Sequence, residues 1–282
     1  MDKVSELLKK VEILPASPAL LPKLSRALGN VHNTDLDEIV DIIAFDSALT
    51  AKLLQIANSA YFGSDTPITS VGEAVSQVGY DAVYLLAASI SGENCLRTQP
   101  GTGLDAVLLW KHSVTTAFGA QHIASAAGLD GNLLFTAGLL HDLGKVVFAE
   151  VHGKNYTSMF DPANRGSLSL VEWENAQYGC NHAEVGAALL QRWKLPPAIV
   201  AAVRFHHNLS AAGENAPFAA CICLGDALSR TLELPAFSLD ETNPDIQQAL
   251  QVVNLTVADL NNQWNRIRKN WEFVQNLFDL RK

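Results

Sequence analysis

Apolar residues recur along much of the chain at the spacing of one face of a helix. A representative run has aliphatic residues at intervals of 3, 1 and 3 positions, namely Leu36, Ile39, Val40 and Ile43. This spacing is typical of an amphipathic α-helix. A series of alternating strand segments joined by hairpin turns is not found. The pattern therefore predicts an all-α protein with many helices of ordinary length.

Expected helix starts are marked by a short polar residue followed by proline or by an acidic residue. These signals stand at Ser17-Pro18, Thr34, Ser70 with Glu73, Ser169 with Glu172, Asn243-Pro244, and Thr256 with Asp259. Three polar or glycine- and proline-containing segments resemble linkers: 92–103, 209–217 and 232–244. We therefore expect an N-terminal helical part (1–100), a histidine-rich helical part (101–231) and a C-terminal loop with an amphipathic helix (232–282).

The last expected helix has an apolar seam at heptad spacing. Its members are Leu260, Trp264, Ile267, Trp271, Val274 and Phe278. An amphipathic helix usually docks on its own domain, and we expect the seam to be buried. The alternative is a dimer or partner surface that carries the two tryptophans.

Composition narrows the function classes. The chain has 282 residues, of which 48% are hydrophobic and 17% charged, so it can bury a sizeable core. The net charge of −9 disfavours general nucleic-acid binding and RNA degradation. We find no signal peptide or membrane span, and the four cysteines lack zinc-knuckle spacing, so we expect a cytoplasmic protein with buried thiols.

Histidine and aspartate residues gather in apolar helical contexts in the second half of the chain. The set is His112, His141, Asp142, His182, His206, His207 and Asp226. A single histidine of this kind is usually a satisfied polar group at a helix end. Burying all seven without a common partner would cost several kcal/mol each. A shared metal ion accounts for them economically, because imidazole nitrogens and carboxylate oxygens are metal ligands.

The adjacent pair His141-Asp142 restricts the geometry. Neighbours on a helix point about 100° apart, so both reach one centre only near a helix end or distortion. Gly144 is compatible with such an end. Asp142 has two oxygens and can bridge two metal ions, and the His206-His207 doublet could serve the second ion.

The order His112, His141-Asp142, Asp226 resembles the HD superfamily of metal-dependent phosphohydrolases. His182 and the His206-His207 doublet resemble its binuclear branch, which includes the HD-GYP phosphodiesterases. The N-terminal segments LPASPALLPKL, FDSALTAKLLQIANSAYFG and ITSVGEAVSQVGYDAVYLL are similar to the HDOD domain, an HD-related output domain of bacterial signalling proteins. The resemblance covers roughly residues 10 to 230 and implies an HD-like helical bundle.

The resemblance implies a ligand set and catalytic roles. Metal one would take His112, His141, Asp142 and Asp226, and metal two would take Asp142, His182, His206 and His207. In the enzymatic relatives a metal-bridging hydroxide attacks phosphorus. Lys145 would then contact a phosphate oxygen, and Arg204 is a weaker candidate. Mixed His/Asp ligands suit iron, manganese, zinc, cobalt or nickel.

Two functions follow from the resemblance. The first is an HD-type phosphohydrolase acting on a small phosphoester or nucleotide with two divalent ions. The second is a non-catalytic signalling module that binds a partner protein and carries a structural or vestigial metal, since many HDOD domains have lost the ligands. His207 is followed by Asn208-Leu209-Ser210 rather than by a Gly-Tyr-Pro motif, so the resemblance does not extend to cyclic-di-GMP specificity.

Overall fold

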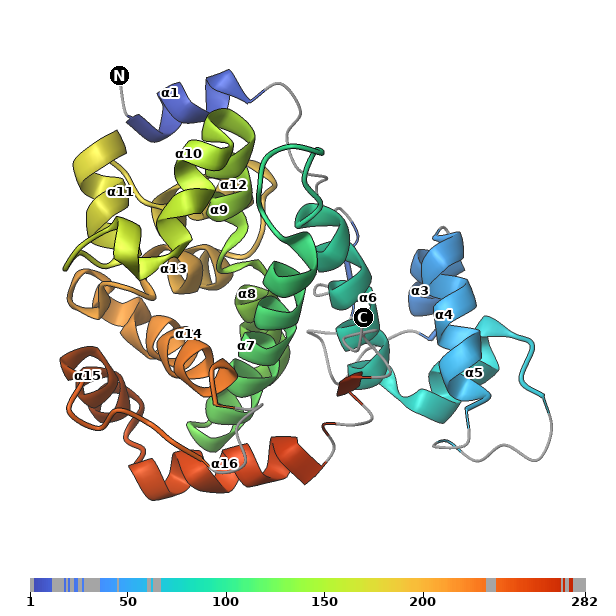
Figure 1. Cartoon of the computed structure of the whole chain (residues 1–282). Helices are drawn as coiled ribbons and strands as arrows, with labels where there is room; N and C mark the ends of the chain where they lie inside the picture. Colours follow the sequence, from blue (N-terminus) through green and yellow to red (C-terminus); the bar gives the residue numbers. More distant parts are fainter. Residues whose placement is uncertain are drawn as a thin grey trace. The chain divides into compact units, whose positions relative to one another are not determined.

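The computed structural model describes residues 3–11, 18, 20, 23–24, 27, 36–44, 46–59, 62, 67–231, 237–269, 271 and 274–275. Within these residues all regular secondary structure is helical, which confirms the predicted all-α class. The chain forms two compact units (Figure 1). One comprises Ser17–Asn94, and the other joins Met1–Ala16 to Cys95–Lys282. The three-part division at 100 and 231 stays a prediction.

The unit Ser17–Asn94 has its own apolar core. Its described helices are α3 (Leu36–Ala44), α4 (Ser47–Ala57), α5 (Val71–Val78) and α6 (Tyr80–Cys95). Ile39, Ile43 and Leu53 are fully buried. As expected, the Ser70 hydroxyl accepts a hydrogen bond from the Glu73 backbone N–H and caps α5. The expected loop at Gly92 begins only after Cys95, because α6 continues through the glycine.

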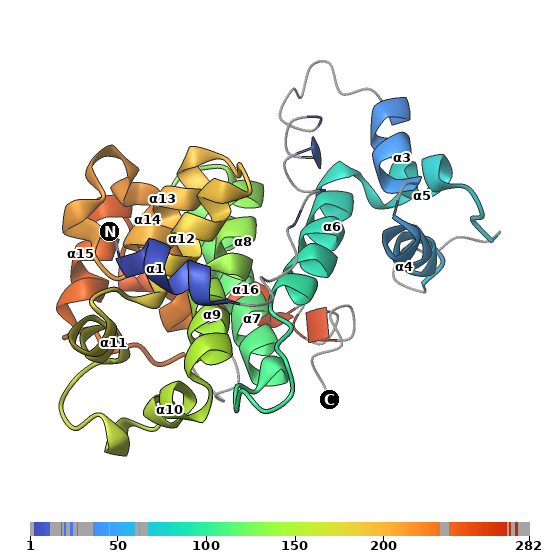
Figure 2. The ribbon, with the colours of Figure 1, turned by 90° about the horizontal axis from the view of Figure 1, so that it is seen from above.

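The second unit contains the remaining helices. They are α1 (Lys3–Lys10), α7 (Ala106–Ala126), α8 (Gly131–Leu140), α9 (Leu143–His152), α10 (Lys154–Thr157), α11 (Leu170–Tyr178), α12 (His182–Arg192), α13 (Pro197–Phe205), α14 (Ala216–Ser229), α15 (Pro244–Val253) and α16 (Val257–Lys269). Short 3-10 turns lie at 158–160, 162–164, 209–211 and 213–215. The long helix α7 packs against α8, α14 and α16. Helix α13 packs against α8, and α12 lies beside α13 and α9 (Figure 2).

Small residues let the central helices approach closely. A Cβ atom built on Gly119 of α7 would lie 3.0 Å from the Cα atom of Gly225 in α14. His112 lies seven residues before Gly119, about two helical turns along the same face. Asp226 directly follows Gly225. The glycine contact therefore fixes the two helices that carry these two candidate ligands.

The predicted helix starts that fall on described residues are all present. Ser169 and Glu172 form a complete capping box at the start of α11. Asn243 caps α15, with Pro244 in its first turn. The Asp259 carboxylate accepts hydrogen bonds from the backbone N–H and hydroxyl of Thr256, next to the start of α16. The signals expected at Ser17 and Thr34 lie outside the described residues.

The C-terminal seam is buried as far as the structure describes it. The buried members are Leu260, Trp264, Ile267, Trp271 and Val274; Phe278 lies outside the described residues. Helix α16 packs on α7, and the Trp264 indole N–H donates to the Thr231 carbonyl over 3.3 Å. The part of the seam in α16 therefore docks on its own unit, as expected from the sequence.

The four cysteines have the buried or half-buried thiols that the sequence predicted. Cys95, Cys180 and Cys221 are buried free thiols, and Cys223 is half-buried. Burial raises the pKa of Cys95 and of Cys221 to about 12. Among the described helices, none combines the length and apolarity needed to cross a membrane.

Candidate metal centre

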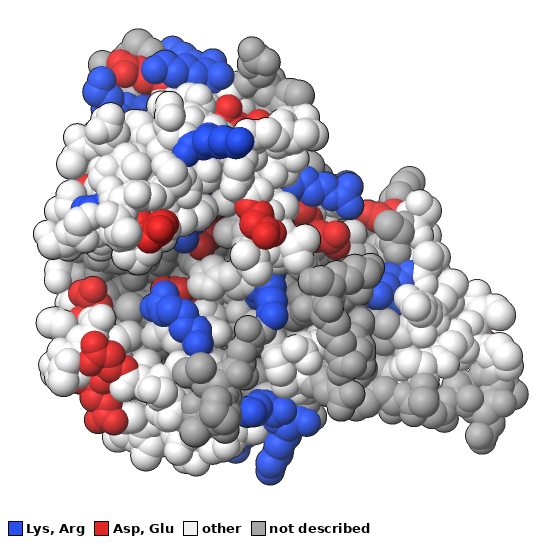
Figure 3. Space-filling model, in the orientation of Figure 1, with Lys and Arg blue, Asp and Glu red and all other residues white. Residues whose placement is uncertain are grey.

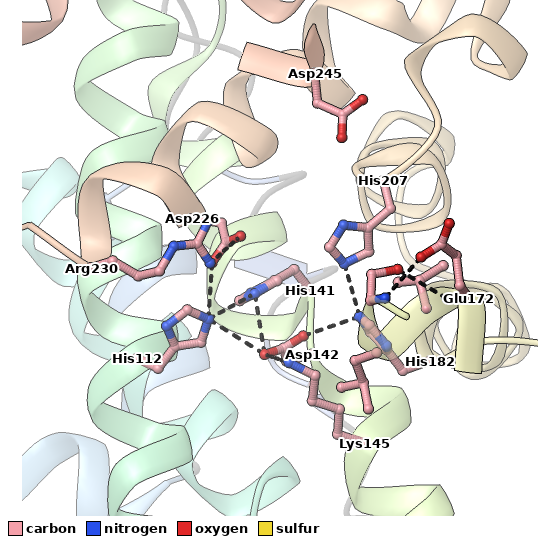
Figure 4. A pocket seen from close by; sticks show the side chains of 13 residues that line it. His112, His141, Asp142, Lys145, Glu172, His182, His207, Asp226, Arg230 and Asp245 are labelled. Carbon is pink, nitrogen blue, oxygen red and sulfur yellow. Dashed lines mark hydrogen bonds and ion pairs between the residues drawn. The ribbon is translucent and has the colours of Figure 1, made fainter. Parts of the chain in front are cut away.

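The candidate ligands surround one cavity in the second unit (Figure 4). The cavity has a volume of about 690 Å³. Its lining includes His112, His141, Asp142, Lys145, His182, His207 and Asp226. His206 does not line the cavity, but its ring centroid is 5.2 Å from that of His141. Residues from α7, α9 and α14 and from three helix ends thus meet at one place.

The pair His141-Asp142 stands at the junction of two helices. His141 follows the last residue of α8, and Asp142 precedes the first residue of α9. Gly144 makes this junction pack closely, since a Cβ atom there would lie 2.0 Å from the His182 carbonyl oxygen. Gly144 therefore serves a close approach between α9 and α12 rather than a helix end.

The two oxygens of Asp142 face different sets of histidines. Its Oδ2 atom lies 3.4 Å from the Nε2 atoms of both His112 and His141. Its Oδ1 atom lies 3.4 Å from Nε2 of His182. The carboxylate therefore divides the centre into two halves, and we call these the Asp226 half and the His182 half.

The Asp226 half contains His112, His141, Asp142 and Asp226. Nε2 of His112 lies 3.3 Å from Nε2 of His141 and 3.3 Å from Oδ1 of Asp226. The His182 half contains Asp142, His182, His206 and His207, and in it Nε2 of His182 lies 3.1 Å from Nε2 of His207. Three groups of three side chains can be drawn from these seven. Within each group the potential ligand atoms lie within 4.8 Å of one another.

Hydrogen bonds fix the tautomers of four imidazoles. Nδ1 of His141 contacts the Gly138 carbonyl at 2.8 Å, and Nδ1 of His206 contacts the Val203 carbonyl at 2.6 Å. Nδ1 of His182 contacts the Glu174 carboxylate at 2.8 Å. Ser229 donates its hydroxyl proton to the Asp226 carbonyl, so its oxygen accepts from Nδ1 of His112 at 3.2 Å. Since each Nδ1 atom is then the donor, each Nε2 atom keeps a free lone pair.

These lone pairs suit a metal ion. Nε2 of His206 is buried and has no hydrogen-bond partner, which is costly unless the atom has another partner. Nε2 atoms about 3 Å apart would also place lone pairs against each other. A cation between them removes both difficulties. The residues therefore fit the metal site that the sequence predicted.

The protonation states of the imidazoles also suit a metal ion. Burial lowers the pKa of His112 to about 4, although Asp142 and Asp226 act in the opposite direction. Burial, with the neighbouring His141 and His182, lowers the pKa of His206 to about 3. These imidazoles are therefore neutral at pH 7, as metal ligands must be.

The carboxylates are ionised. Burial acts to raise the pKa of Asp142, but the neighbouring histidines and Lys145 hold it well below the usual value. For Asp226, His112 and Arg230 likewise outweigh burial and lower the pKa.

Lys145 and Arg204 differ in position. Lys145 lines the cavity and donates a hydrogen bond of 2.6 Å to Oδ2 of Asp142. Arg204 is exposed and lies over the Phe205 ring, so it is not part of the lining. The structure adds Arg230, which contacts the Asp226 carboxylate at 3.0 Å.

Sequence reasoning missed the residues that support the ligands. Ser229 and Arg230 lie three and four positions after Asp226, so they could have been found as its neighbours on one helix face. Glu174 gave no such signal, because it acts across the turn between α11 and α12. In sequence it resembles the exposed Glu172, whereas its own side chain is fully buried.

The fold and the site together define an all-helical protein with a histidine- and aspartate-rich metal-type centre. The chain matches the HDOD domain over residues 14–209 and belongs to that family. This confirms the resemblance seen in the sequence. Asp226 lies beyond the matched segment.

The chain aligns with only part of each of its longer sequence relatives. An uncharacterized protein of Treponema pallidum is 32% identical over 209 residues, which are 73% of this chain and 40% of that protein. Ribonuclease Y of Opitutus terrae is 33% identical over 120 residues, which are 43% of this chain and 17% of the enzyme. The chain thus spans less than half the length of each of these relatives.

Solved structures share the fold over nearly the whole chain. An HDOD domain protein of unknown function from Geobacter sulfurreducens has a TM-score of 0.74 and 24% identity, covering 98% of this chain and 96% of that one. A proposed phosphohydrolase from Shewanella amazonensis has a TM-score of 0.73 and 21% identity, with 97% of each chain covered.

Proposed function

We propose that this HDOD protein is a metal-dependent phosphohydrolase of the HD type that acts on a small phosphoester or nucleotide. The observation that carries the proposal is the set of four imidazoles whose Nδ1 atoms are all engaged as donors. Their Nε2 atoms are left for metal ions, with two carboxylates alongside. Such a set is typical of a two-ion hydrolytic centre.

Each half of the centre would hold one divalent ion, with Asp142 as the bridging ligand. His112, His141 and Asp226 would complete the first set, and His182, His206 and His207 the second. When bound, the ions supply Lewis acidity for the phosphoryl oxygens and a water of lowered pKa. The ligand chemistry suits iron, manganese, zinc, cobalt or nickel.

Lys145 is the side chain best suited to a substrate phosphate. It lines the cavity, and its ammonium group is held against Oδ2 of Asp142 at 2.6 Å. A metal ion on Asp142 would compete for that oxygen. The ammonium would then turn toward a phosphate oxygen and stabilise the charge that develops there.

The surroundings of the cavity favour a compact substrate over a polymer. Glu172 and Asp245 line it together with Leu170 and Val171 (Figure 4), so a phosphodiester chain leaving the site would meet carboxylates. On the face drawn in Figure 3, the described Lys and Arg residues stand among acidic and uncharged ones. With a net charge of −9, these features disfavour RNA as a substrate, although ribonuclease Y is a relative.

A signalling role is the second candidate. All the residues that line the cavity lie between His112 and Asp245. The unit Ser17–Asn94 therefore contributes none of these residues. It also has an apolar core of its own. Such a unit suits contact with a partner protein, and both roles can coexist in one chain.

The test is turnover by protein of known metal content. Mn²⁺-loaded protein is assayed on p-nitrophenyl phosphate, bis-p-nitrophenyl phosphate and a nucleotide panel. We expect hydrolysis of at least one small ester, abolished by chelation. Lys145→Gln should lower kcat/KM by about 10²-fold or more at unchanged metal content, while the exposed-lysine control Lys154→Gln should match the parent. Full metal loading without turnover of any ester would favour the signalling role.

A further inference from the structure

Glu174 is a fully buried carboxylate behind the candidate metal centre. It lies in α11 and does not line the cavity. Its two oxygens accept three hydrogen bonds from Tyr156 and His182. Because an ionised carboxylate is an acceptor only, this geometry makes Glu174 a buried negative charge beside the site.

Both oxygens of Glu174 accept hydrogen bonds. Oε2 accepts from the backbone N–H of His182 at 2.9 Å and from its Nδ1 atom at 2.8 Å. Oε1 accepts from the hydroxyl of Tyr156 at 2.6 Å. On the far side of the ring, Nε2 of His182 faces Oδ1 of Asp142. Tyr156, Glu174 and His182 thus form one chain that ends at the metal centre.

This contact differs from those of the other fixed histidines. The Nδ1 atoms of His141 and His206 meet neutral carbonyl groups, and that of His112 meets a hydroxyl. Only His182, among these four, meets an anion. An anionic acceptor makes the imidazole a stronger metal ligand and fixes its orientation.

The contact between Glu174 and His182 matters because the two halves of the centre contain different numbers of carboxylates. The Asp226 half contains two carboxylates, Asp142 and Asp226. The His182 half shares Asp142 but has three imidazoles and no carboxylate of its own. Without Glu174, a divalent ion there would face much weaker charge compensation.

We propose that Glu174 is the positioning residue of the His182 half, and that it supplies through His182 the negative charge that Asp226 supplies directly to the other half. This inference rests on the proposed metal centre but not on turnover. Tyr156 holds the second oxygen of Glu174 and so keeps the carboxylate directed at the ring.

A simple structural role can be separated from this one. Glu174 also satisfies the first backbone N–H of α12, so its removal could act only through that helix start. Glu184 offers a matched control, because its carboxylate accepts from the Asn181 backbone N–H at the same helix start without touching a histidine ring. Glu174→Gln is nearly isosteric and keeps an oxygen that can accept from His182, but it removes the charge.

The experiment is a Co²⁺ titration of the full chain, followed by visible absorption and by metal analysis. Parent, Glu174→Gln, Glu184→Gln and His207→Ala are compared after circular dichroism has shown that each is folded. We expect two equivalents in the parent. Glu174→Gln should weaken, by about 10–100-fold, the same equivalent that His207→Ala removes, and Glu184→Gln should bind as the parent does.

A second readout needs no metal. In ¹⁵N-histidine-labelled apoprotein, NMR should show the His182 ring with its proton on Nδ1, and that proton should move upfield in Glu174→Gln because a neutral acceptor replaces an anion. Two parent-like equivalents in Glu174→Gln would overturn the inference and leave the metal centre intact. Equal weakening in Glu184→Gln would overturn it too. A parent that binds no Co²⁺ would refute the metal centre and the inference together.

Discussion

Asp142 is the residue on which both halves of the candidate centre depend. Its two oxygens face different histidines, and it is almost fully buried. The sequence analysis expected Asp142 to face two sides because its carboxylate has two oxygens. Its role as a metal bridge stays a prediction.

Asp142→Asn should remove at least one metal equivalent. The amide carries no charge and is a poor bridging ligand, so two ions would repel each other with less compensation. Mass spectrometry of the metal-loaded protein gives the stoichiometry. The fold should persist, because the change is nearly isosteric, and circular dichroism serves as the control. Unchanged stoichiometry would contradict the bridging role, whereas an unfolded variant would show that the cluster is structural.

At the scale of residues, the candidate ligands could be predicted from the sequence, but the side chains that support them could not. Glu172 and Glu174 stand two positions apart in one helix, and sequence alone gives them similar roles. Their difference arises from the turn that ends α11, where Gly179 adopts a left-handed conformation with φ of 74°. That turn brings the start of α12 against Glu174, and such contacts between helices are not encoded in the periodicity of either one.

At the scale of the elements, the crossing of α9 and α12 positions the site. Helix starts with local signals, such as Ser169 and Asn243, were predictable because a cap is a contact within a few residues. The crossing was not, since it depends on small residues far apart in sequence. A Cβ atom on Gly186 of α12 would lie 3.2 Å from the backbone nitrogen of Gly144, so both helices contribute a glycine.

Gly144→Ala should strongly destabilise the protein. The added carbon would meet the His182 carbonyl oxygen at 2.0 Å, so the helices must separate, at a cost of about 1–3 kcal/mol or more. Gly72→Ala is the control: its Cβ atom would meet Val40 at 3.8 Å, and alanine is the better helix former. Urea unfolding measures both. Equal stability of the two variants would contradict the close-crossing argument.

The contact between α1 and α9 should depend on pH through His152. Its ring stacks on Tyr178, with centroids 4.3 Å apart, and its Nε2 atom is buried without a partner. Burial, with the nearby Lys10, lowers its pKa. The unfolded chain then binds the proton more readily, so the contribution of His152 is complete above about pH 6.5 and declines as the pH falls below it.

His152→Phe keeps the stacking and removes the titration. In chelator, the free energy of unfolding of the parent should fall more steeply from pH 7.5 to 5 than that of the variant. Urea unfolding across this range gives the pH dependence of the unfolding free energy for both proteins. Both contain the site histidines, so their contribution cancels when one slope is subtracted from the other. Identical slopes would show that His152 does not titrate differently in the folded and unfolded states.

At the scale of the whole molecule, the candidate metal centre lies in one of the two compact units, and Ser17–Asn94 contributes none of the residues that line its cavity. The helical class and the HDOD family were predictable, because periodicity and local motifs are spread along the chain. The assignment of Met1–Ala16 to the unit of Cys95–Lys282 was not. It depends on the packing of α1 against α9 and α12, a contact between residues more than a hundred positions apart.

Metal binding should stabilise one unit selectively. The five tryptophans all lie between Trp110 and Trp271, so intrinsic fluorescence reports on the metal-centre unit, while far-UV circular dichroism reports on both. A ligand at 100 times its Kd adds about 2.7 kcal/mol to the unit that binds it. For a domain of this size the melting temperature then rises by about 5–10 °C.

Thermal melts with Mn²⁺ and with chelator should therefore show a shifted fluorescence transition, while part of the dichroism signal keeps its melting temperature. Equal shifts of the whole signal by both probes would mean that the units unfold as one, and an unshifted fluorescence transition would contradict the metal centre.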